Sequence, residues 1–393
     1  MGILKKRKLN IAIAYDAINQ EINGSSISTF RFAQLLSKRG HKVIFISTTS
    51  KHIKKEFYYQ DKIKIYLFNS VHLPKSSAMS IGFSSTKKIA SVLMKEKIDI
   101  LHVMIPTPLT LISIKAAKKL NIKVVSHSHA QPENILLHLP RIFQISFMRN
   151  LLNKYVFWIN KDTEIVFCPS KFAERNFKKN NPNSKTMVVS NGVNRNIFKK
   201  INPSSFIKRF NLSKRVRIFY VGRISPEKCI DVLIKSTPFI LKSYQNFEVN
   251  IVGVGYQREE LERLSEKLGI QKHVKFLGRL SEKDLPLAYN ACDIFVLPSL
   301  AELEGMVVLE AMACGKPILI ANSKESASVD FVDGNGFLFK SGNPKDLAEK
   351  ALKLLKDNSL REEMGKKSFE LAKEYDINRS VDKLEKAYYS LVL

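Results

Sequence analysis

Short apolar runs alternate with longer amphipathic segments along the first half of the chain. In Ser26–Arg39 the apolar residues recur at helical spacing, which predicts a helix with one buried face. The short runs are near-continuous in Val, Ile and Phe, as is typical of parallel strands buried on both faces. The expected strands are Leu9–Tyr15, Lys42–Ser47, Ile63–Phe68, Ile98–Met104, Lys123–His127, Glu164–Cys168 and Thr186–Val189. This alternation predicts a doubly wound α/β domain.

A polar, proline-containing stretch at Asn191–Asn211 interrupts the pattern, which then restarts. The second set of expected strands is Val216–Val221, Glu248–Val252, Val274–Leu277, Asp293–Leu297 and Pro317–Ile320. We therefore predict two α/β domains, residues 1–194 and residues 195–376, with a linker near residues 195–212. We expect a final helix, Ile377–Leu393, to return to the first domain.

The length and composition agree with this organisation. At 393 residues the chain exceeds the size at which one hydrophobic core usually stops growing. Its apolar fraction of 45% and mean hydropathy of −0.12 are those of a packed protein rather than a disordered one. The apolar run near the N-terminus is too short for a signal peptide. No window approaches the roughly 18 apolar residues of a membrane-spanning helix.

The chain is strongly basic, with 64 Lys and Arg against 36 Asp and Glu and a formal net charge of +28. This charge could serve contacts with nucleic acid or with an anionic membrane, or it could be a solvated lysine-rich surface. Charge alone does not choose among these. The cysteines form no CxxC pair, so we expect reduced, mostly buried thiols rather than a zinc site or disulfides. They are Cys168, Cys229, Cys292 and Cys314.

Ligands of open α/β sheets bind outside the carboxyl ends of the strands, so the loops after the strands are the candidate sites. Asn23 and Gly24 precede the helix predicted from Ser26. Free N–H groups at such a helix start favour an anion, although an ordinary capped turn fits these residues equally well.

The segment from Ser126 to Asn134 is unusually polar and includes His127 and His129. A His-x-His pair can bind zinc, but no third ligand lies at metal spacing. We also expect the alternation of side chains along a strand to place the two histidines on opposite faces. We therefore favour a sugar or phosphate contact for His129 and a structural role for His127.

Two cations flank an expected helix start after the first strand of the second domain. Arg223 and Lys228 lie on either side of Pro226, which suits an early helical position. Cations beside a helix N-terminus supply the charge, the donors and the dipole that a diphosphate requires. A capped helix with two surface charges is the alternative, but the position directly after a strand favours a binding site.

Three glutamates are concentrated in the segment ELEGMVVLEAMACGKP, which begins at Glu302. Carboxylates accept hydrogen bonds from sugar and ribose hydroxyls. Glu302 and Glu304 could instead simply favour the dipole of the following helix. Glu310 is not explained in that way, because it lies in the apolar run Met306–Ala313, where an unpaired carboxylate is costly to bury. A ligand hydroxyl would supply a partner.

Taken together, these motifs resemble retaining glycosyltransferases of family four, which have the GT-B fold, over nearly the whole chain. The most specific match is the pair Glu302 and Glu310, separated by seven residues and followed by AMACGKP. The segment HAQPEN, which begins at His129, resembles diacylglycerol glucosyltransferases and related lipid hexosyltransferases. The other matching elements are VGR…EK at Gly222, Arg223, Glu227 and Lys228, NGV at Asn191–Val193, and the glycine loop at Asn23 and Gly24.

The resemblance implies two Rossmann-like domains that face a central cleft, with a role for each matching residue. His129 and Glu302 would be catalytic residues at the transferred sugar. The donor diphosphate would be bound by Arg223, Lys228 and Gly24. The donor sugar and ribose would be contacted by Glu302, Glu304, Gly305, Met306 and Glu310, with Glu310 on the ribose. The remaining cleft residues would be Asn23, Gln131, Glu133 and Asn191.

The chain departs from the family pattern at one point that matters for the donor sugar. The family commonly has EGFG where this chain has Glu302-Leu303-Glu304-Gly305, so either Glu302 or Glu304 could contact the sugar. The family usually works without a bound metal and the chain has no DxD triplet, so no metal or cofactor is expected. No residue is a convincing covalent nucleophile. Retention would then follow from attack on the face that the diphosphate leaves.

The implied reaction moves a hexose, with glucose expected, from a UDP-linked sugar to a lipid acceptor such as 1,2-diacylglycerol. Arg141–Asn160 and Lys75–Lys97 mix apolar and cationic residues as interfacial helices do, although core helices with a basic face fit equally well. We expect a cytoplasmic protein on the inner face of the cell membrane. The alternatives are a soluble or cell-wall glycan acceptor and a non-catalytic sugar-nucleotide-binding protein. Nucleic acid is not an expected partner.

Overall fold

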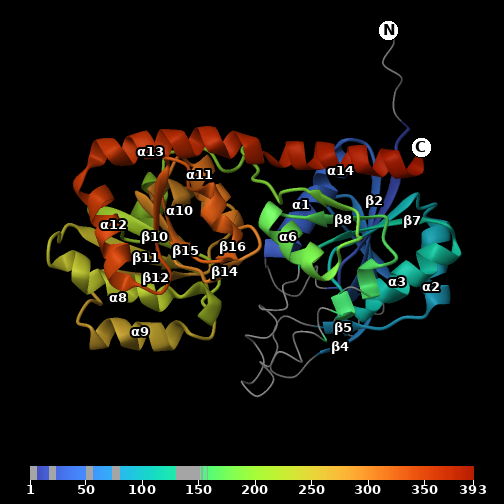
Figure 1. Cartoon of the computed structure of the whole chain (residues 1–393), viewed down its shortest axis with the longest axis horizontal. Coiled ribbons are helices and arrows are strands. Elements are labelled where there is room, and N and C mark those ends of the chain that lie inside the picture. The colour runs from blue at the N-terminus through green and yellow to red at the C-terminus, as the bar shows by residue number, and fades with distance from the viewer. Residues whose placement is uncertain are drawn as a thin grey trace, which may run out of the picture. The chain divides into compact units, whose positions relative to one another are not determined.

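The computed structural model describes residues 7–16, 24–49, 56–72, 80–129, 151, 154–156 and 158–393 (Figure 1). Contacts divide the chain into two compact units, Met1–Ser190 with Asn378–Leu393, and Asn191–Ile377. The chain therefore leaves the first unit after Ser190, four residues before the boundary expected at residue 194. The stretch expected as a linker, residues 195–212, contains the short helix α7 (Ser204–Arg209).

The first unit is built on a sheet of order β3-β4-β2-β1-β6-β7-β8-β9, with β5 paired to β4. All seven expected strands are confirmed, while β3 and β5 are additional and pair antiparallel to β4. The order reverses at β1, which lies between β2 and β6. The strands are β1 (Asn10–Ala14), β2 (Lys42–Thr49), β3 (Phe57–Gln60), β4 (Ile63–His72), β5 (Ser80–Gly82), β6 (Ile100–Val103), β7 (Lys123–His127), β8 (Ile165–Cys168) and β9 (Thr186–Val188).

Helices cover both faces of this sheet (Figure 1). The apolar side chains of α2 belong to the core with those of α3, so α2 is a core helix rather than an interfacial one. Within the described part of the chain, no helix is both long and apolar enough to cross a bilayer. The helices of this unit are α1 (Gly24–Lys38), α2 (Thr86–Lys95), α3 (Pro108–Lys119), α6 (Lys171–Asn180) and α14 (Ile377–Val392).

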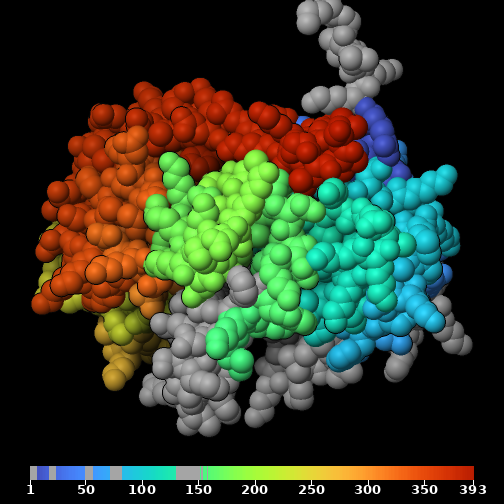
Figure 2. All heavy atoms as spheres, turned by 45° about the vertical axis from the view of Figure 1, so that its right-hand side comes forward, coloured from blue at the N-terminus to red at the C-terminus, as the bar shows by residue number. Residues whose placement is uncertain are grey.

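The C-terminal helix α14 is fastened to the first unit by polar contacts. Glu385 accepts a hydrogen bond from Arg39 and also pairs with Nε2 of His41, at 2.7 Å. The hydroxyl of Tyr388 lies 2.7 Å from Nδ1 of the buried His102. In the space-filling view the red α14 lies directly against the blue and green residues of this unit (Figure 2). The helix is thus part of the first unit despite its distance in sequence.

The second unit is a parallel six-stranded sheet of order β12-β11-β10-β13-β15-β17. The order reverses between β10 and β13, which pair directly. Helices α8 and α9 lie on one side of this sheet and α10 and α11 on the other (Figure 1). The strands are β10 (Val216–Val221), β11 (Phe247–Val252), β12 (Val274–Gly278), β13 (Ile294–Leu297), β15 (Ile318–Asn322) and β17 (Gly336–Lys340), with the pair β14 (Ala301–Glu302) and β16 (Glu325–Ser326) outside it. The helices are α7, α8 (Ile230–Leu241), α9 (Arg258–Lys267), α10 (Leu285–Ala291), α11 (Met306–Ala313), α12 (Pro344–Lys356) and α13 (Asn358–Leu371).

The first unit should lose stability in mild acid because it buries neutral histidine. Burial, and secondarily the proximity of His129, lowers the pKa of His102 from 6.5 to about 3. Between these values the unfolded chain binds a proton at His102 that the folded chain does not bind, so the free energy of unfolding falls as the pH falls below about 6.5. From pH 7 to pH 5 we expect a loss of about 2 kcal/mol from His102 alone.

Asp16 acts in the opposite direction, because burial raises its pKa to about 6, and it offsets about 1 kcal/mol of that loss. Urea unfolding monitored by the fluorescence of Trp158, the single tryptophan, measures the first unit. The His102→Gln variant should show a weaker dependence on pH. An unchanged dependence in that variant would exclude His102 as the source.

Candidate active site

The loops that follow β10 and β13 are neighbours because these two strands pair at the point where the sheet order reverses. Nζ of Lys228, in the segment after β10, lies 2.6 Å from Oε1 of Glu302, at the end of the short strand β14 that follows β13. Both side chains are largely buried, with exposures of 14% and 12%. The structure thus joins the cation expected at the diphosphate to the carboxylate expected at the donor sugar.

Arg223 lies on the same loop as Lys228 and is held by Glu227, for which we predicted no separate role. Its guanidinium donates to Oε1 of the buried Glu227 at 3.1 Å, and Ser225 Oγ donates to the same oxygen at 2.6 Å. Burial works to raise the pKa of Glu227, but these partners hold it below its usual value. The guanidinium is half-exposed, so it is anchored and still accessible to an anion.

The loop after β13 turns into α11 at Gly305, whose φ is +93°. A Cβ at this position would lie 2.2 Å from Oγ of Ser328. That hydroxyl donates to the carbonyl oxygen of Glu304 at 3.1 Å. Glycine is therefore required here, and the turn leaves Met306 as the first residue of α11.

Glu304 points into the second unit. Its Oε2 accepts a hydrogen bond from the backbone N–H of Asn191 at 3.0 Å, and the residue is 3% exposed. Asn191, which was expected to line the cleft, is itself buried. The two glutamates therefore have different contacts. Glu302 pairs with Lys228, whereas Glu304 holds the backbone of Asn191, the first residue of the unit.

Glu310 is buried in α11, as its apolar surroundings predict, and it has a partner within the chain. The hydroxyl of Tyr289, from α10, donates to Oε2 of Glu310 at 2.9 Å. Burial and the adjacent carboxylate raise the pKa of Tyr289 well above its ordinary value, so Tyr289 stays a donor. Sequence reasoning missed Tyr289 because it lies 21 residues from Glu310 with no local signal.

In the first unit, Gly24 is exposed and is the first residue of α1, while Asn23, Gln131 and Glu133 lie outside the described residues. The prediction that His127 and His129 occupy opposite faces is wrong. Their rings are stacked, with centroids 4.3 Å apart and planes 3° apart. Residues i and i+2 of an extended chain share a face, and a hydrogen bond from the backbone N–H of His129 to the carbonyl oxygen of His127, at 3.2 Å, tightens the chain here and brings the two rings together.

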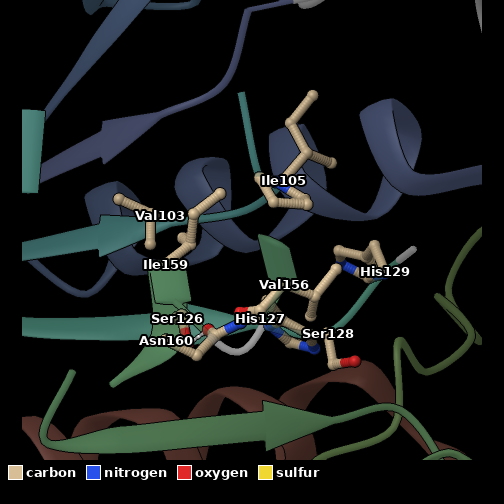
Figure 3. Close-up of a pocket in the computed structure, with 10 residues that line it drawn as sticks. Val103, Ile105, Ser126, His127, Ser128, His129, Val156, Ile159 and Asn160 are labelled. Atoms are coloured by element: carbon tan, nitrogen blue, oxygen red, sulfur yellow. Dashed lines mark hydrogen bonds between the residues drawn. The ribbon is translucent and has the colours of Figure 1, made fainter. Parts of the chain in front are cut away.

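Both histidines line a pocket at the carboxyl ends of β6 and β7 (Figure 3). Its other walls include Ser126 and Asn160, whose side chains are joined by a 2.5 Å hydrogen bond. Burial lowers the pKa of His129 to about 4 and that of His127 well below its usual value. Neutral imidazoles exchange hydrogen bonds with hydroxyls but carry no charge for a phosphate, so these two rings suit a hydroxyl rather than a phosphate.

No group of three His, Cys, Asp or Glu side chains that could hold a metal occurs among the residues that the structure describes. Cys168, Cys292 and Cys314 are buried free thiols, and Cys229 is partly exposed. The expectation of unpaired, mostly buried cysteines is confirmed.

Two named relatives are similar to most of this chain. The chain is 25% identical to the sulfoquinovosyl transferase of Arabidopsis thaliana over 92% of its own length and 69% of the relative's. It is 24% identical to the alpha-monoglucosyldiacylglycerol synthase of Streptococcus pneumoniae over 79% of its own length and 70% of the relative's. The structure of Anabaena HepE in complex with UDP-glucose superposes with a TM-score of 0.77 at 19% identity, over 97% of this chain and all of that one.

Two family models match consecutive parts of the chain. The model described as "Glycosyltransferase Family 4" matches residues 22–196, and the model described as "Glycosyl transferases group 1" matches residues 188–371. Together they span both units and include the residues around Arg223, Glu302 and Glu310. The chain therefore belongs to the family-four glycosyltransferases and has their GT-B fold.

Proposed function

We propose that this glycosyltransferase moves a hexose, with glucose as the expected sugar, from a UDP-linked donor to a lipid acceptor such as 1,2-diacylglycerol. The observation that supports it best is the ion pair of Lys228 and Glu302 where the sheet order reverses, with Arg223 held by Glu227 on the same loop as Lys228. The relative named as a glucosyldiacylglycerol synthase supports the acceptor, and the neighbour that binds UDP-glucose supports the donor.

In this proposal the donor diphosphate binds to Arg223 and Lys228. Arg223 provides a guanidinium that Glu227 already orients, and Lys228 provides an ammonium that is mostly withdrawn from water. Charge interactions are stronger in such a partly buried site than in water. Both cations would therefore stabilise the negative charge that develops on the leaving nucleoside diphosphate. Gly24 is the proposed phosphate contact from the first unit.

The sugar hydroxyls are assigned to Glu302 and the ribose hydroxyls to Glu310. The Glu302 carboxylate is largely buried, is held in place by Lys228, and has a second oxygen for a hydroxyl. The Glu310 carboxylate is buried and is held in place by the hydrogen bond from Tyr289. The backbone at Gly305 and Met306 would approach the sugar or the diphosphate, since the left-handed turn leaves the start of α11 without a capping side chain.

Transfer requires the acceptor hydroxyl oxygen to form a bond to the anomeric carbon as the bond to the diphosphate oxygen breaks. The hydroxyl proton passes to the leaving phosphate, so no covalent enzyme intermediate is needed. Attack on the face that the diphosphate leaves gives retention. His129 is assigned to the hydroxyls of the transferred sugar, for which its neutral ring is suited.

Exposed residues of the first unit support binding to an anionic membrane surface. Trp158 is 43% exposed, and Nζ of Lys115 and Nζ of Lys161 lie 5.9 and 6.0 Å from the centre of its ring. Leu151 is also exposed. An aromatic ring among lysines suits the headgroup region of a bilayer.

Arg223→Ala and Lys228→Ala should each lower kcat/KM by about 100-fold to 1,000-fold, the usual cost of removing one charge-stabilising donor. The measurement is donor turnover by the purified protein, with folding checked by circular dichroism. Lys235→Ala is the matched control, because Lys235 pairs only at the surface with Asp231, at 2.8 Å on α8. Near-normal rates in both test variants would exclude the diphosphate assignment.

Glu302→Gln and Glu304→Gln form an isosteric pair that separates sugar binding from anchoring. Glu302→Gln should lower kcat/KM for the donor about 10-fold to 100-fold, because it weakens charge-assisted hydrogen bonds to the sugar. Glu304→Gln should keep the KM for the donor and lose about 1–2 kcal/mol of stability, because it weakens the bond to Asn191. Donor titrations and urea unfolding measure the two effects. The opposite pattern would assign the sugar to Glu304.

The whole proposal is tested with vesicles of anionic phospholipid that contain 1,2-diacylglycerol, incubated with a panel of nucleotide sugars. We expect a glycosylated diacylglycerol, identified by mass, and sedimentation of the protein with the vesicles that weakens at high salt. Trp158→Ala should weaken sedimentation without reducing hydrolysis of the donor. The absence of a glycosylated lipid with every donor, or no sedimentation at low salt, would exclude the lipid assignment.

A further inference from the structure

The ring of His129 rests on a column of aromatic rings that runs through the first unit. His127 is next in the column, and its ring lies parallel to that of His129 with centroids 4.3 Å apart. The backbone N–H of His129 also donates to the carbonyl oxygen of His127, at 3.2 Å. Among the described residues, no side chain is hydrogen-bonded to the His129 ring. In the described part of the chain, stacking on His127 is therefore the ring contact that orients His129.

His127 can support this ring because it is itself fixed on several sides. It is 3% exposed, and its ring is stacked on those of His102 and Phe32, with centroids 5.5 and 6.0 Å away and planes 17° and 21° apart. Phe167 packs against it at 5.9 Å with a tilt of 47°. These three rings come from β6, α1 and β8. A side chain packed so closely has no room to change rotamer.

The column continues to the C-terminal helix. His102 stacks on His127, and its Nδ1 is hydrogen-bonded to the hydroxyl of Tyr388 at 2.7 Å. Tyr388 is fully buried in α14 and packs edge-on against His102 with centroids 5.9 Å apart. Tyr388, His102, His127 and His129 thus form an unbroken series of contacts that ends at the pocket of Figure 3.

We propose that His127 is a positioning residue for glycosyl transfer, whose flat ring holds the imidazole of His129 in one orientation. The inference rests on the proposed role of His129 at the transferred sugar. His127 acts on His129 through the flat face of its ring, while a nitrogen at the edge of the ring faces the backbone carbonyl of Val189. A displacement of about 1 Å at a reacting group can cost about 100-fold in rate, so a stacked support of this kind affects turnover.

Two substitutions of similar size separate the shape of the ring from its volume. His127→Phe keeps a flat ring and should turn over within about threefold of the parent. His127→Leu fills the space without a flat ring and should lower kcat by about 10-fold to 100-fold with little change in the KM for the donor. The His127→Leu change should cost nothing further when combined with His129→Ala, since both changes remove the same function.

The assay is donor turnover with UDP-glucose, and the unfolding midpoint from Trp158 fluorescence shows that each variant is folded. If the leucine variant does not accumulate, His127→Met removes the flat ring with a more adaptable side chain. A normal kcat in the leucine or methionine variant would overturn the positioning role. So would a phenylalanine variant as slow as the leucine variant, because the nitrogens would then be required. Normal turnover by His129→Ala would instead overturn the assignment of His129, on which this proposal rests.

Discussion

The ion pair between Lys228 and Glu302 depends on a topological constraint, and much of the second unit is arranged around that constraint. Parallel strands present their carboxyl ends at one edge, and the reversal of order between β10 and β13 sends the following helices to opposite faces. The loops after these two strands are therefore neighbours although 74 residues separate the two side chains. Because the pair is mostly buried, neither group could be removed without leaving an uncompensated charge. Glu302 thus balances the charge of Lys228 within the protein.

The alternation of strands and helices could be predicted from the sequence because the central strands are continuous apolar runs. β3 and β5 were not predicted because they are short strands that pair only with β4. In β3, the last two residues, Tyr59 and Gln60, are also exposed. The helix α7 was not predicted because it lies in a polar stretch that we interpreted as a linker. Such segments are ordered by tertiary contacts, for which local periodicity carries no signal.

Some of the site residues could be predicted from the sequence, but their partners could not. The glutamates and the loop cations could be found because each lies directly after a strand or in a motif. Their partners could not, since Glu304 binds a backbone group 113 residues away and Glu310 binds Tyr289 from a different helix. That His127 and His129 lie on the same face could have been predicted from the sequence, because a spacing of two residues in an extended chain places both rings on one face. The burial of Glu310 was predicted correctly from its apolar neighbours.

The return of α14 to the first unit has a consequence for how the molecule is made. His102 and His41 find their partners 286 and 344 residues later in the chain. A ribosome that has translated the whole first sheet has not yet produced the helix that covers one of its faces. The second unit, which is continuous in sequence, can close its own core before that helix emerges. The first unit to be synthesised is therefore the last to be completed, and until then its buried histidines remain open to solvent and to other chains.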